Sequence, residues 1–120
     1  MAAFASAPLR RDYVLVAGGS FFRQWRIKDR VSGDPVDLTG ATVDWHIRTA
    51  LDAVAIEVNL SAFVSVTDGP NGEITMDAPP SATLGKTPAV LFYDMRLTRG
   101  TVIDYLIQGE FNLLQPVTRT

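Results

Sequence analysis

Two runs of alternating side chains, joined by a connector rich in glycine, aspartate and proline, most constrain what this chain can fold into. The runs cover residues 20–29 and 42–48, and the connector covers residues 32–41. Alternation with a period of two is the geometry of a β-strand, in which successive side chains point to opposite faces. Trp25 and Trp45 fall on the apolar phase of their runs. The pattern predicts two half-buried strands in a layer of sheet, with both tryptophans facing inward.

Alternation and turn residues predict further strands along the rest of the chain. Turn signals stand at Gly18-Gly19, at Asp68–Gly72 and at Arg99-Gly100, and a proline-rich crossover covers 78–88. The expected strands are 9–16, 53–59, a piece near 63–66, 73–77, 91–98 and 102–114, with a bulge or bend at Gly109. About seven short strands without a long amphipathic helix predict an all-β fold, an antiparallel β-sandwich.

Length and composition place this fold in a single domain and exclude several classes of function. The chain has 120 residues, 47% of them hydrophobic, which is enough for one hydrophobic core over residues 9–114. It has no cysteine, so disulfides and thiolate sites are excluded. The net charge of −2, with dispersed basic residues, argues against nucleic-acid binding.

The two ends of the sequence are expected to be arms outside the sandwich. Residues 1–8 are small and apolar and are predicted to form a flexible N-terminal arm, and residues 115–120 a polar C-terminal tail. No cationic leader precedes a long apolar run and no segment has the length to span a bilayer, so we expect no signal peptide and no membrane partner. The chain is expected to be synthesised in a cytoplasm.

The residues that most invite a chemical role also have structural explanations. His46, the single histidine, shares its strand face with Asp44 and Arg48, and a polar cross-strand cluster explains it without catalysis. Asp29, Asp34 and Asp37 surround the connector and could be drawn as a calcium site, as could Asp68, Asn71 and Asp77, but turns require the same residues. We expect no catalytic residue, no cofactor and no metal.

The aromatic residues separate into a core set and an exposed set. A sugar-binding platform could use Trp25 and Trp45, but their phase assigns them to the core between the sheets. Tyr93 lies on the inward phase and is expected to bond nearby backbone, as in the tyrosine corner of sandwiches. Outward-pointing aromatic and arginine residues predict a protein interface, with coverage by a loop of the same chain as the alternative; these residues are Phe22, Arg26, Phe92 and Arg96.

The order and spacing of short motifs resemble those of a family of small immunoglobulin-like modules from tailed bacteriophages. That family is related to the N-terminal domain of upper baseplate proteins and includes stand-alone virion proteins. The motifs that carry the resemblance are Gly19-Ser20-Phe21, residues 34–43, Gly72–Met76, Tyr93–Leu97, Gly109–Leu113 and Val117-Thr118-Arg119, with Leu38-Thr39-Gly40-Ala41 as the most distinctive.

The resemblance implies an immunoglobulin-like sandwich with a structural role in the virion and without catalysis. The expected role is an adaptor or connector in the tail, baseplate or fibre-attachment region, with other virion proteins as partners and many copies in a symmetric assembly. A capsid decoration protein is the first alternative. A carbohydrate-binding or adhesive module is the second, since the same fold serves both classes.

Overall fold

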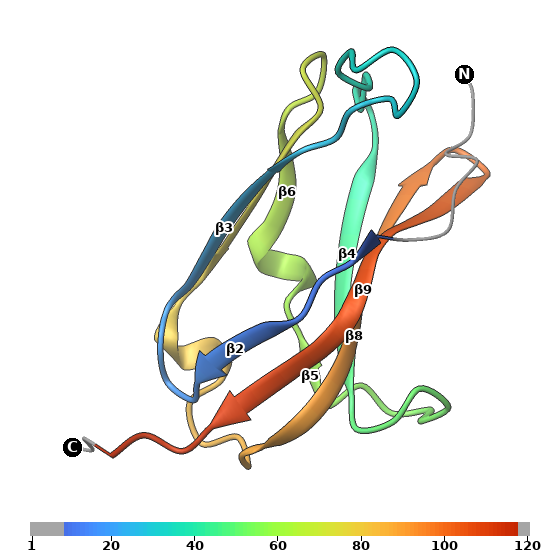
Figure 1. Ribbon diagram of the computed structural model, residues 1–120. Helices are drawn as coiled ribbons and strands as arrows, with labels where there is room; N and C mark the ends of the chain where they lie inside the picture. Colours follow the sequence, from blue (N-terminus) through green and yellow to red (C-terminus); the bar gives the residue numbers. More distant parts are fainter. Residues whose placement is uncertain (1–8, 118–120) are drawn as a thin grey trace.

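Nine strands form two sheets that pack face to face in the computed structural model, which describes residues 9–117 (Figure 1). The six-stranded sheet contains β1 (Leu9–Arg10), β2 (Tyr13–Val16), β9 (Val102–Leu114), β8 (Ala89–Arg99), β4 (Thr42–Arg48) and β5 (Val58–Asn59). The three-stranded sheet contains β3 (Phe21–Arg26), β7 (Glu73–Ala78) and β6 (Val64–Asp68). The predicted all-β sandwich is therefore confirmed. The predicted N-terminal arm, 1–8, and residues 118–120 of the predicted tail lie outside the described residues.

The helical content of the described chain is two single turns. These are η1 (Ser61–Phe63), which connects β5 to β6, and η2 (Pro80–Ala82), in the crossover between β7 and β8. Within residues 9–117, neither turn has the length or apolar character needed to cross a membrane.

The core lies between the sheets and is built from the inward phase of each strand. In β4, Val43, Trp45 and Ile47 are buried and pair across the ladder with buried residues of β8. On the three-stranded sheet, Ile74 and Met76 of β7 are fully buried and face this layer. The buried hydrophobic residues form one cluster: Leu15, Ala17, Phe21, Leu38, Val43, Trp45, Ile47, Val58, Leu60, Val64, Ile74, Met76, Ala78, Leu91, Tyr93, Met95, Leu97, Ile107, Phe111 and Leu113.

An aromatic stack occupies the centre of this core. The rings of Trp45 and Tyr93 are parallel, with centroids 4.4 Å apart, and the edge of Phe111 packs against both. Trp45 is fully buried, as predicted. Trp25 differs from the prediction because it is only partly buried: it lies on the edge strand β3, and its Nε1 donates a hydrogen bond of 3.0 Å to the Tyr13 hydroxyl.

The edge strand that begins the described chain is interrupted, which the sequence did not predict. The expected continuous strand 9–16 is split into β1 and β2, and both pair with β9 in parallel, whereas every other strand pair is antiparallel. At the break, the Arg11 carbonyl accepts a 2.7 Å hydrogen bond from the Tyr93 hydroxyl, and Asp12 Oδ1 accepts one from the Glu110 amide. Tyr93 thus bonds backbone, but of a residue 82 positions away rather than nearby.

Gly109 makes room for this break, which corrects its predicted role as a bulge or bend. It pairs in register with Tyr93 of β8, and the irregularity in this ladder falls instead between Met95 and Arg96, where Leu106 has no partner. A β-carbon at Gly109 would overlap the Arg11 carbonyl oxygen. The glycine is therefore required for space and not for its backbone torsions.

The predicted strand over 53–59 is also wrong for most of its length. Only Val58 and Asn59 pair, with Ile47 and His46, and the preceding residues form a loop in which Val54 is 95% exposed. The Arg48 side chain bonds the carbonyls of Ala53 and Val54 at 3.3 and 2.6 Å, which holds the loop against the end of β4. Alternation over a short apolar run cannot show whether a neighbouring strand is present to pair with it.

Replacing Trp45 by Ala should remove the centre of the stack and reduce the free energy of unfolding by about 3–5 kcal/mol, as for other large-to-small core changes. Trp25→Ala should cost clearly less, because that ring is only partly buried. Urea unfolding of both variants measures the difference. Equal losses, or a smaller loss for Trp45→Ala, would contradict the assigned burial.

Gly109→Ala should force the Arg11 carbonyl away from β9 and destabilise the fold by about 1–3 kcal/mol, the usual cost of inserting a group into filled space. Gln108→Ala is the matched control, because the Gln108 side chain is exposed, and its effect should stay within about 0.5 kcal/mol. Thermal or urea unfolding measures both. A Gly109→Ala variant as stable as the control would show that the break tolerates a β-carbon.

Candidate functional site

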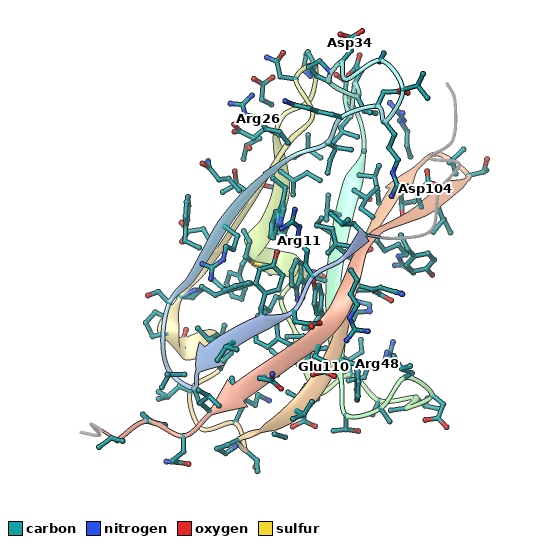
Figure 2. All side chains as sticks on the ribbon, in the orientation of Figure 1. Arg11, Arg26, Asp34, Arg48, Asp104 and Glu110 are labelled. Carbon is teal, nitrogen blue, oxygen red and sulfur yellow. The ribbon has the colours of Figure 1, made fainter. Side chains whose placement is uncertain are left out.

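The four residues predicted to form an interface lie on two opposite faces of the sandwich. Phe22 and Arg26 belong to β3 and point outward from the three-stranded sheet, while Phe92 and Arg96 belong to β8 and point outward from the six-stranded sheet. Figure 2 shows Arg26 on the far side of the molecule from Arg48 and Glu110, which lie on the six-stranded sheet. The structure therefore separates the predicted set into two pairs.

The outer face of the three-stranded sheet is polar around Phe22. Phe22 is 51% exposed and stands opposite Asp77 of β7. Along the same face, Arg26 pairs with Glu73 at 3.2 Å, and Gln24 donates to the Thr75 hydroxyl at 3.4 Å. Phe22 is thus a single aromatic side chain on an otherwise polar surface.

On the opposite face, Arg96 is held by an ion pair within the chain. Its Nη2 donates to Asp44 Oδ2 across the β4–β8 ladder at 2.8 Å, and this hydrogen bond raises the pKa of Arg96 above its ordinary value. Phe92, four pairs further along the β4–β8 ladder and on the same face, is half-buried.

An exposed apolar patch continues from Phe92 toward the end of the same face. We define this patch as Val14 and Val16 of β2, Val90 of β8 and Leu114 of β9, which are 43–57% exposed. Val14 and Val90 flank Asn112 in adjacent ladders, and Val16 pairs with Leu114, so the four side chains are neighbours. This patch was not predicted from the sequence. The signal was the apolar outward-facing residues of β2 and at one end of β8 and of β9, and only the strand order shows that these residues are adjacent.

Two polar cross-strand rows next to the patch border a hollow. One row runs Glu110–Phe92–Arg48 across β9, β8 and β4. The other begins at Arg10 of β1 and continues through Gln108, Asp94 and His46 across the same three strands. Together with Leu51 from the 49–57 loop, these rows line a hollow of about 230 Å³. His46 therefore faces Asp94 directly, rather than clustering only with Asp44 and Arg48 along its own strand.

Burial sets the protonation of Asp94 in this hollow. Desolvation of its carboxyl group raises the pKa of Asp94, and the nearby positive charges of His46, Arg48 and Arg96 oppose this shift without cancelling it. The carboxyl group of Asp94 makes no hydrogen bond to another side chain or backbone group among residues 9–117. An acidic group that is half-buried and unpaired is available to a ligand.

The carboxylates of two aspartates around the connector accept hydrogen bonds that stabilise turns. Asp29 Oδ1 accepts hydrogen bonds from the Val31 and Ser32 amides at 2.8 and 3.0 Å. Asp37 Oδ1 accepts from the Thr39 amide and hydroxyl at 2.9 and 2.6 Å. Within residues 9–117, no three acidic, histidine or cysteine side chains gather as they would around a metal ion.

In comparisons with protein-family models and with curated protein sequences, no match to this chain is found. The outer face of the six-stranded sheet, with its apolar patch and its hollow, is therefore identified as the candidate site from its geometry.

The three perturbed aspartates should titrate in a defined order. Backbone hydrogen bonds from Ser32 and Val31 lower the pKa of Asp29, and hydrogen bonds from Thr39 lower the pKa of Asp37, whereas burial raises the pKa of Asp94. Carboxyl-carbon NMR should show Asp94 titrating above the ordinary aspartate pKa of 3.8 and the other two below it. An Asp94 midpoint at or below 3.8 would contradict the desolvation of the hollow.

The sign of the stability effect differs between these groups. Folded protein binds more protons at Asp94 than unfolded protein does just above pH 3.8, so this group lowers stability as the pH rises through that window. Asp29 and Asp37 act in the opposite direction: their contribution is complete above pH 3.8 and is lost as the pH falls through their folded pKa. Asp94→Asn should abolish the first effect and leave the second.

Proposed function

We propose that this chain is a non-enzymatic structural protein of a tailed-phage particle, an adaptor that binds another virion protein through the outer face of its six-stranded sheet. The single observation that carries the interface is the exposed apolar patch Val14, Val16, Val90 and Leu114. Contiguous exposed apolar surface on a soluble sandwich marks a site of protein contact, because it is costly to leave in water. The virion context rests on the family resemblance.

The strand order supports the immunoglobulin-like part of this proposal. In immunoglobulin-like sandwiches, the third strand (C) shares one sheet with the last two strands (F and G), and the second strand (B) pairs with E, whose other neighbour is D. Here β4, β8 and β9 share one sheet, with β5 added at the edge of β4, and β3, β7 and β6 form the other. One difference is that β2 lies along β9, where constant-type domains place the first strand beside the second.

A non-enzymatic role is supported by the surroundings of the single histidine. His46 faces Asp94 and the 49–57 loop, and no hydrogen bond joins it to a serine or threonine hydroxyl in the described part of the chain. Nucleophilic catalysis by a serine or threonine requires a base within hydrogen-bond reach of the hydroxyl group. A tail, baseplate or fibre-attachment adaptor is preferred, and a capsid decoration protein is the competing location.

A pair of variants on the two faces tests the interface. Val90→Ser with Leu114→Ser should leave the isolated domain folded, since both side chains are exposed, and should sharply reduce incorporation into particles. Phe22→Ser is the matched control, because it also removes an exposed apolar side chain but from the polar face. Complementation in phage-producing cells, followed by mass spectrometry of purified heads and tails, measures incorporation and location.

Three outcomes would contradict the proposal. The first is absence of the wild-type chain from purified particles. The second is normal incorporation of the Val90→Ser, Leu114→Ser variant. The third is loss of incorporation with Phe22→Ser alone, which would place the interface on the three-stranded sheet. Phe92→Ser, measured in the same way, tests whether the contact extends from the patch into the neighbouring hollow.

A further inference from the structure

The hollow beside the apolar patch has the form of a small-ligand site. Its floor is the regular ladder of β9, β8 and β4, and one wall is the loop that Arg48 holds through the Ala53 and Val54 carbonyls. Its volume, about 230 Å³, is below the roughly 300–1,000 Å³ of sites for drug-sized ligands. A ligand that fills it is about the size of one sugar ring or one large side chain.

Several polar groups that line the hollow are not used by the fold. The side chains of His46, Asp94 and Gln108 make no hydrogen bond to another group among residues 9–117, although they stand side by side in one cross-strand row. Together they offer two carboxylate oxygens, an amide oxygen and nitrogen, and two imidazole nitrogens. This mixture of donors and acceptors matches hydroxyl groups, which both donate and accept.

Charges in the hollow are balanced. Arg10 pairs with Glu110 at 3.7 Å, and Arg48 and Asp94 bring one positive and one negative charge to the same surface. A strongly anionic or cationic ligand would therefore meet repulsion as well as attraction. In particular, a basic side chain approaching Asp94 would also approach His46, Arg48 and Arg96, whose charges already act on that carboxylate.

Phe92 supplies the apolar wall. Its half-buried ring lies in the row adjacent to Asp94 and Gln108, between Glu110 and Arg48. Binding pockets typically combine an aromatic surface with a few polar groups that fix orientation. The apolar face of a sugar ring requires such a surface while its hydroxyl groups require hydrogen-bond partners at the rim.

We propose that this hollow binds a single neutral saccharide ring, with the ring packed against Phe92 and its hydroxyl groups hydrogen-bonded to Asp94, His46 and Gln108. This site does not depend on the proposed virion role, because it is a property of the isolated domain. It also differs from the platform considered for Trp25 and Trp45, of which Trp45 is fully buried.

Proton–nitrogen NMR of the purified full chain tests the proposal. The probes are the methyl glycosides of glucose, galactose, rhamnose and N-acetylglucosamine at millimolar concentration. At least one should shift the backbone amides of Phe92, Asp94 and Gln108 in a saturable manner, and leave those of Gln24 and Thr75 on the opposite face unchanged. Absence of a saturable shift from all four probes overturns the proposal.

Matched variants assign the contacts. Asp94→Asn keeps the size of the side chain and should weaken binding of the responding glycoside about tenfold, as expected for one hydrogen bond to a charged group. Phe92→Leu should weaken it as well, because the flat ring surface is lost, whereas Phe22→Leu should not. Unchanged affinity in both hollow variants overturns the proposal, provided that their amide spectra show a folded domain.

A second set of probes separates the saccharide from a protein side chain. N-acetyl-lysine amide and N-acetyl-arginine amide present the basic groups that a protein partner would insert beside Asp94. Shifts at the hollow with these probes and none with the glycosides would show that the hollow receives a partner's side chain, and the saccharide proposal would be wrong.

Discussion

The stack of Trp45 on Tyr93, with the hydrogen bond from the Tyr93 hydroxyl to the Arg11 carbonyl, is the contact on which the rest of the structure depends. It joins β4 to β8 through their buried faces and ties the interrupted edge strand to the centre of the core. Burial of the Tyr93 hydroxyl strongly raises its pKa, so it remains a neutral donor to Arg11. Gly109 leaves the space that this edge strand needs.

The same contact decides which residues reach the outer surface. Because Tyr93 is fixed inward, strand geometry directs its neighbours Phe92 and Asp94 outward. Trp45 does the same for His46 on the adjacent strand. The hollow is therefore a consequence of the core, and its aromatic wall and free carboxylate are positioned by a rigid ladder rather than by a mobile loop.

The two outer faces of the sandwich differ in what they can bind. Arg26 with Glu73 and Gln24 with Thr75 satisfy one another on the three-stranded sheet. The six-stranded sheet instead leaves an apolar patch and unpaired polar groups next to each other. Exposed apolar side chains and unused hydrogen-bonding groups gain most from a partner or ligand, which is why both proposals fall on this face.

The amino-acid sequence by itself determined the class of fold and most of its strands, because alternation with a period of two can be recognised within a few consecutive residues. The bounds of β4, the turn at Gly72 and the burial of Trp45 follow from that pattern. It could not show that β3 and β8 lie in different sheets, so Phe22 and Phe92 were placed on one surface. It also could not show that residues 53–57 lack a partner strand. Only the tertiary structure decided the strand order, because pairing between distant segments depends on the whole core. That order brings Val14, Val90 and Leu114 together in the patch. It also places Phe92, Asp94 and His46 around the hollow.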